Sequence, residues 1–370
     1  MKPELLQAVE ASDIGRVNQL LTEEFQKGSD PWEVHLGLFP LVQRVLNPPF
    51  INPHLPKMYR ICRDLVPYLK KDESSAFLRL EVAEYARRPK LEEFPRQEVL
   101  TITVSFSDIE SAIRERDREK TAVLMAAFYA QAGGAEFARR LLILGSGYLQ
   151  ESLGHSVSCT AFILLEMLER KDQDPWPALA TLADYFCKGH FHTTPVLLKT
   201  PTSYSQDALE HHLLRATSGR GIVNLHHTIT IYAIEHVRQF FTVEEYHHMI
   251  AAWIAFMGEK ESQPVKLDQS KANLQNDYSR FYEMFSALEA KPVVASLQGM
   301  TASDQGRLQL GRFILKGLCD RYQGDYNPHY LTGLGSTLWV TDRFWKQSAI
   351  VVNALYQYLD FLFDGLKSKN

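Results

Sequence analysis

The stretch "ELLQAVEASDIGRVNQLLTEEFQKG" (residues 4–28) shows the pattern that decides the fold. Its apolar residues recur at steps of three, four and seven, with charged residues between them, which is typical of amphipathic helices that bury one face. Gly28 follows the last apolar turn as a helix C-cap would. "SDPWE" (29–33) then combines a capping side chain with a proline, which is typical of a helix start. The stretch therefore predicts a helical hairpin.

The same helical period continues along the rest of the chain. It covers residues 109–131, 135–150, 155–170, 175–187, 206–218, 226–240, 242–258, 271–288, 303–320 and 339–365. One stretch, "EVLTITVSF" (98–106), alternates as a strand does, but a lone strand is marginal unless it pairs, so we interpret it as a linker. We predict an all-α fold, a multi-helix bundle.

A weak internal repeat links two helical hairpins. "LLQAVEASDIGRVNQLL" (5–21) aligns with "IESAIRERDREKTAVLM" (109–125), and each is followed by a glycine turn, a further helix and a histidine. The histidines are His54 and His155. This favours duplication of a hairpin plus a histidine-bearing helix. The alternative, that any two amphipathic hairpins align this well, stays open.

The domain organisation that we expect follows from this repeat. We predict a single all-α domain over residues 1–370, with sub-repeats at 1–90 and 107–190 and a C-terminal helical part at 204–370.

Composition and charge limit the partners and the cellular location that we expect for this protein. The net charge of −4 gives no electrostatic reason to expect nucleic acid or an anionic membrane as partner. The sequence holds no run of eighteen apolar residues, and its first residues lack the apolar core of a signal peptide. The four cysteines are far apart, so we expect reduced thiols and a cytoplasmic location. A homodimer is the expected oligomer on general grounds.

Histidines stand near the start of two long apolar segments, "LGHSVSCTAFILLEML" (153–168) and "NLHHTITIYAIEHV" (224–237). Counting three, four, seven and eleven residues on from His155 gives one helical face, made of Ser158, Cys159, Phe162 and Glu166. Because such a polar face is unusual in a packed core, it predicts the lining of an internal cavity.

We take His54, His155 and His226 as candidate catalytic residues, since imidazole titrates near neutrality and can act as general acid or base. The candidate substrate-binding residues are His227, Cys159, Ser158, Trp345 and Lys346. The aromatic content suits a flat apolar substrate. The alternative for each histidine is a buried ring that donates to a backbone carbonyl near a helix start.

The residues themselves leave three options for the cofactor: none, a diffusible reductant, or a metal held by the histidines. The metal set that we consider is His155, Glu166 and His226, because divalent metals favour imidazole and carboxylate ligands. "VEEYHH" (243–248) has the Glu-x-x-His spacing of di-iron bundles, but the matching second helix is missing. We interpret it as the first turn of a solvated helix.

The three histidine-bearing segments resemble the questin oxidase-like family. "LGHSVSCTAFILLEML" followed by "PWPALATLADYF" (175–186) is similar to one block of that family. "LHHTITIYAIEHV" (225–237) resembles its later histidine helix, and "NPHLPKM" (52–58) resembles an early His-Leu-Pro element, in the same order. The family's late Asp-x-His-x-x-Lys element is matched only by "TDRFWKQ" (341–347), which lacks the histidine. The sequence also resembles helical domains that are fused to Rieske modules, although the Rieske motif itself is incomplete.

The resemblance implies an oxidoreductase that performs Baeyer–Villiger-type oxygenation of an aromatic small molecule, with dioxygen and reduced nicotinamide. Two alternatives remain. One is a metal-dependent oxygenase that uses histidine and glutamate ligands, and the other is a helical ligand-binding or scaffold protein without catalysis.

Overall fold

The computed structural model describes residues 3–92, 103–170, 173–189, 191, 206–259, 261, 263–267, 277–324 and 327–368. Within these ranges the chain forms nineteen α-helices and no β-strand, so the predicted all-α fold is confirmed. Residues 98–102 of the alternating stretch lie outside the described ranges, and Phe106 at its end begins a helix. No described helix combines the length and the apolar character that crossing a membrane requires.

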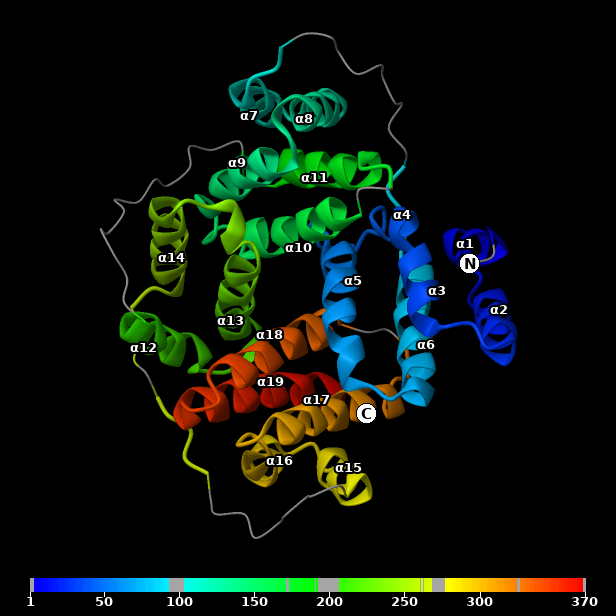
Figure 1. The fold of residues 1–370 in the computed structure, drawn as a ribbon, viewed down its shortest axis with the longest axis vertical. Helices are drawn as coiled ribbons and strands as arrows, with labels where there is room; N and C mark the ends of the chain where they lie inside the picture. Colours follow the sequence, from blue (N-terminus) through cyan, green and yellow to red (C-terminus); the bar gives the residue numbers. More distant parts are fainter. Residues whose placement is uncertain are drawn as a thin grey trace. The chain divides into compact units, whose positions relative to one another are not determined.

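Figure 1 labels the helices in chain order. Those of the first half are α1 (Pro3–Glu10), α2 (Ile14–Gln26), α3 (Pro31–Gly37), α4 (Phe39–Val42), α5 (His54–Leu65), α6 (Lys71–Arg87), α7 (Phe106–Glu115), α8 (Arg118–Ala132), α9 (Gly134–Ser146) and α10 (His155–Glu169). Those of the second half are α11 (Trp176–Lys188), α12 (Gln206–Thr217), α13 (Gly221–His236), α14 (Val243–Met257), α15 (Tyr278–Ser286), α16 (Ala290–Leu297), α17 (Asp304–Asp320), α18 (His329–Arg343) and α19 (Ser348–Lys367).

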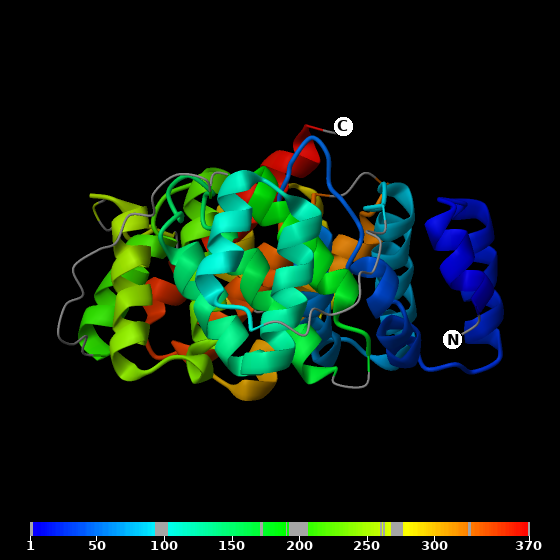
Figure 2. The same ribbon diagram turned by 90° about the horizontal axis from the view of Figure 1, so that it is seen from above.

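The opening stretch forms α1 and α2, which pack side by side (Figure 2). The chain turns between them at Ser12, whose φ of 58° is left-handed, and the Asp13 side chain accepts a hydrogen bond from the Arg16 backbone N–H at 2.9 Å. This cap satisfies a donor that the first turn of a helix leaves unpaired. Gly28 is also left-handed, at φ 84°, and Pro31 begins α3. The predicted hairpin, cap and helix start are confirmed here.

The chain folds into two compact units. The first unit comprises residues 1–63, 78–202 and 233–256, and the second comprises 64–77, 203–232 and 257–370. In the first unit α10 packs against α9 and α11, and α8 packs against α7 and α11 (Figure 1). In the second unit α19 packs against α12, α16 and α18. Each unit contains two helices whose buried histidines position the candidate site, although the last residues of α5 and α13 belong to the other unit.

Candidate functional site

In the first unit, two helices begin with a histidine. His54 opens α5 directly after Pro53, whose fixed φ suits the entry to a helix. His155 opens α10 after Gly154, which turns the chain with a φ of 77°. Such a positive φ is unfavourable for residues with a Cβ atom. Both side chains are buried, with 1% and 3% exposed.

The two rings of the first unit face each other through their Nε2 atoms, which are 2.8 Å apart. The ring planes are nearly perpendicular, at 87°. The sequence predicted that these two histidines hold equivalent positions, and the fold brings them together as a pair. We call His54 and His155 the first-unit pair.

Hydrogen bonds at Nδ1 decide the protonation of this pair. His155 Nδ1 lies 2.7 Å from the Ser152 carbonyl oxygen, which can only accept, so the proton of the neutral ring sits on Nδ1 and Nε2 carries a lone pair. His54 Nδ1 accepts from the Asn47 side-chain Nδ2 at 3.1 Å, so its proton sits on Nε2. His54 therefore donates to His155, and both rings can remain neutral.

The second unit holds a similar pair, made of His226 on α13 and His329 at the start of α18. Their Nε2 atoms are 3.0 Å apart, with the ring planes at 78°. Both side chains are buried, with 2% and 8% exposed. We call them the second-unit pair. His226 was predicted from the sequence, whereas its partner His329 was missed.

A repeated tripeptide could have identified His329. "NPHLPKM" (52–58) and "NPHYLTG" (327–333) both place Asn-Pro-His at the start of a helix. The paired histidines are separated by 101 residues in the first unit and 103 in the second. This similarity is consistent with duplication, which stays a hypothesis.

Protonation differs in the second-unit pair. His226 Nδ1 lies 2.8 Å from the Ile222 carbonyl oxygen and must donate to it. His329 Nδ1 lies 2.8 Å from Asn327 Oδ1, an atom that also accepts the His329 backbone N–H at 3.0 Å and is therefore the amide oxygen. Both neutral rings thus carry their proton on Nδ1. Two Nε2 lone pairs face each other, and a cation between them, either a proton or a metal ion, would stabilise this arrangement.

The distances fit metal coordination. Two imidazole nitrogens that bind one ion at 2.0–2.1 Å are about 2.9 Å apart when the ligands lie at a right angle, and about 3.3 Å apart in a tetrahedron. The 3.0 Å of the second-unit pair matches the right-angled arrangement, whereas the 2.8 Å of the first-unit pair is the hydrogen bond that His54 donates. Metal-binding histidines usually donate the other ring N–H to a carbonyl or carboxylate oxygen, which fixes the tautomer. His155, His226 and His329 all have such a partner.

Cys159 in the first unit interacts electrostatically with two buried polar side chains, Lys57 and Tyr185. Lys57, Tyr185 and the side chain of Gln43 are buried, and their terminal polar atoms have no hydrogen-bond partner in the described part of the chain. Burial raises the pKa of the Cys159 thiol to about 11, although the Lys57 ammonium acts in the opposite direction. Burial also lowers the pKa of Lys57 and raises that of Tyr185. Cys159 is thus a protonated thiol at neutral pH.

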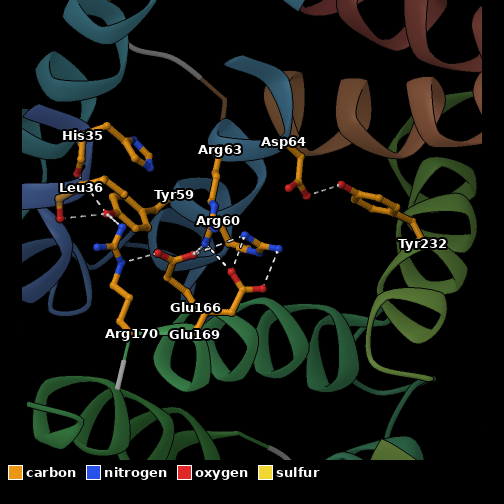
Figure 3. Close-up of polar contacts among 10 residues, drawn as sticks. All are labelled: His35, Leu36, Tyr59, Arg60, Arg63, Asp64, Glu166, Glu169, Arg170 and Tyr232. Carbon is orange, nitrogen blue, oxygen red and sulfur yellow. Dashed lines mark hydrogen bonds and ion pairs between the residues drawn. The ribbon is translucent and has the colours of Figure 1, made fainter. Parts of the chain in front are cut away.

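Glu166 has a different role from the predicted one. Arg60, Arg63 and Arg170 hold its fully buried carboxylate, at 3.6, 3.4 and 2.5 Å respectively (Figure 3). It lies eleven residues beyond His155 on α10, roughly 16 Å along the helix axis. A metal set that combines Glu166 with His155 and His226 is therefore wrong, because three guanidinium groups neutralise this carboxylate at the far end of α10.

The remaining predicted site residues divide between interior and surface. Ser158 on α10 and His227 on α13 are buried, with 0% and 5% exposed. Trp345 is 38% exposed, and the cationic groups of Arg307 and Lys346 each lie 5.3 Å from the centre of its ring. The prediction that Trp345 and Lys346 line an internal cavity is wrong. They follow the end of α18 in a turn, where an indole is stabilised by cations at the surface.

Comparisons of this chain with protein-family models, with curated proteins and with solved structures found no match.

Proposed function

We propose that this protein is an oxidoreductase that binds a divalent transition metal through its second-unit histidine pair and oxygenates an aromatic small molecule. The observation that carries the proposal is the second-unit pair, in which two Nε2 lone pairs lie 3.0 Å apart in the protein interior. A buried pair of this kind is stabilised by a cation, and imidazole is a preferred ligand of iron, copper, nickel and zinc.

The residues fit such a metal. His226 and His329 each have Nδ1 tied to an oxygen atom, which leaves Nε2 as the ligand atom and fixes the ring plane. In the first-unit pair, His155 is oriented in the same way by the Ser152 carbonyl. A bound iron or copper ion would supply the activation of dioxygen, whereas the protein supplies ligand orientation and a dry environment.

The substrate class rests on the resemblance to the questin oxidase-like family. In a Baeyer–Villiger oxygenation, one atom of dioxygen is inserted between the carbonyl carbon and its neighbour, giving an ester or lactone. The other atom leaves as water, which requires two electrons and two protons. Reduced nicotinamide is the donor that we propose. The four unbridged cysteines, three of them buried, agree with a reducing, cytoplasmic location for this reaction, and a homodimer completes the proposal.

Metal analysis tests the proposal directly. The wild-type protein, loaded anaerobically with Fe(II) and desalted, should retain metal, and His329→Ala should lose it. His211→Ala is the matched control, because His211 is an exposed imidazole on α12. The loaded wild type should then consume dioxygen when an aromatic ketone and NADPH are supplied. A wild-type protein that retains no iron, copper, nickel or zinc would contradict the proposal and favour a helical ligand-binding protein.

A further inference from the structure

Lys57 is a fully buried lysine without an anion beside it. It lies on α5, three residues after His54, and none of its surface is exposed. Its Nζ has no hydrogen-bond partner, and no carboxylate pairs with it, in the described part of the chain. Lysine side chains are almost never buried in this way unless they are paired. The position therefore calls for a chemical explanation.

Burial without a counter-charge favours the uncharged amine. Moving an ammonium group into the interior is costly, so the group sheds its proton instead. Burial lowers the pKa of Lys57, and the Cys159 side chain is the group that opposes this shift. Because Cys159 is itself protonated at neutral pH, it supplies no full negative charge. A desolvated amine with a free lone pair is a nucleophile toward carbonyl groups.

Tyr185 and Gln43 are two further buried polar side chains of the first unit. The Tyr185 hydroxyl is buried, has no hydrogen-bond partner in the described part of the chain, and lies within electrostatic range of Cys159. The Gln43 side-chain amide has neither its donor nor its acceptor satisfied there. Gln43 lies beside the same helix as Tyr185, since its carbonyl accepts from Thr181 Oγ1. Buried polar atoms are rarely left unpaired, so Lys57, Tyr185 and Gln43 point to a ligand that supplies their partners.

We propose that Lys57 is a nucleophile that condenses with the carbonyl group of an aldehyde or ketone to form an imine. The Nζ lone pair attacks the carbonyl carbon, and the carbonyl oxygen becomes a hydroxyl group as the nitrogen loses a proton. Tyr185 then donates its proton to this hydroxyl, which leaves as water while the C=N bond forms. The second amine proton returns to the Tyr185 oxygen. The net change is amine plus carbonyl giving imine plus water, with no oxidant or reductant.

This inference goes beyond the proposed oxygenation. Imine formation at Lys57 needs neither a metal ion nor dioxygen, so the two ideas fail separately. It names the substrate class as a small carbonyl compound that enters the first unit beside α5 and α10.

Reductive trapping tests the inference on the full-length protein. Benzaldehyde and sodium cyanoborohydride are added at pH 7, and the modified lysines are located by peptide mass spectrometry. Lys120, which is half-exposed and paired with Glu115, serves as the internal reference. An ordinary lysine with a pKa of 10.4 is only about one part in 2,500 amine at pH 7. Lys57 should therefore be benzylated at least about tenfold faster than Lys120.

Two variants test the roles of Lys57 as the nucleophile and of Tyr185 as the general acid. Lys57→Met should abolish the fast adduct, and Tyr185→Phe should slow it by about 100-fold, the lower end of the usual contribution of a general acid. Trapping in concentrated urea should bring Lys57 and Lys120 to equal rates, which shows that the folded site causes the difference.

Two results would overturn the inference. In the first, Lys57 of the folded wild type reacts no faster than Lys120. In the second, benzoate binds to the wild type and not to Lys57→Met while no imine is trapped, which would make Lys57 an anion-binding ammonium. The trapping rates are also measured on the wild type and on Tyr185→Phe, so the test remains decisive even if Lys57→Met folds poorly.

Discussion

The two histidine pairs have nearly the same geometry, but their rings carry protons on different nitrogen atoms. In each unit, two buried imidazoles meet through Nε2 atoms at 2.8 or 3.0 Å with their planes almost perpendicular. The first-unit pair can satisfy itself, because Asn47 donates to His54 and leaves that ring a proton for its partner. In the second-unit pair Asn327 accepts from His329, so both neutral rings present a lone pair at Nε2. One side-chain amide thus decides whether two neutral rings share a proton or favour a cation between them.

The residue three positions after the Asn-Pro-His histidine also differs. It is Lys57 in the first unit and Thr332 in the second, and both are fully buried with an unpartnered polar atom within the described residues. The same place in two similar helices therefore holds a titratable amine in one unit and a neutral hydroxyl in the other. This makes the units matched controls for each other.

The largest effect is expected from removing the ligands. His226→Ala and His329→Ala should each weaken metal binding by more than roughly 100-fold, since even the partners that orient metal ligands cost 10–100-fold. Titration of each apoprotein with Zn²⁺ or anaerobic Fe²⁺ measures the change. If either variant binds as the wild type does, the second-unit pair is not the metal site.

The next largest effect is expected on stability, from replacing Glu166, which holds α10 in the first unit. Glu166→Ala should lower the free energy of unfolding by about 3 kcal/mol, because it removes a fully buried carboxylate that three arginines share, of which Arg60 and Arg63 keep the carboxylate of Glu169. Glu169→Ala, at a site where the side chain is 40% exposed, should cost less than about 1 kcal/mol. Urea denaturation of both variants measures the difference. Equal effects would mean that α10 is not held by Glu166.

The two asparagines test the protonation argument. Asn327→Leu removes the acceptor that fixes the His329 tautomer and should weaken metal binding about 10–100-fold. Asn47→Leu should change it less, because Asn47 donates to His54 and does not hold a proton on Nδ1. Metal titration compares the variants, and His ¹⁵N chemical shifts report the tautomers. A larger loss in Asn47→Leu would reverse the comparison.

The smallest effect concerns pH. The pKa of Lys57 is lowered from 10.5 in the folded state, so the unfolded chain binds more protons between that lowered value and 10.5. Stability of the wild type therefore rises with pH across this window, relative to Lys57→Met, which lacks the group. Urea midpoints at pH 7 and pH 9 should show a stability advantage of Lys57→Met that shrinks at the higher pH. Thr332→Val should show no such trend, and a trend in both variants would point to another group.

Much of the helical structure could be read from residue order. The period of apolar residues, the Asp13 cap and the Gly28 turn are local features, since they depend on hydrogen bonds within a few residues. His54 and His155 could also be named, because the repeat places them at equivalent helix starts. Trp345 and Lys346 were misplaced, because exposure at the end of a helix depends on which neighbours pack over it.

What the sequence determined by itself is the all-α class and the placing of histidines at buried helix starts, because periodicity and capping act over one or two turns. Only the tertiary structure decided which histidines meet, that His329 completes the second-unit pair, and that Glu166 pairs with arginines. Contacts between residues about a hundred positions apart follow from how helices pack. A hydrogen bond at Nδ1 then sets the chemistry of each ring, and that partner is fixed by the fold around it.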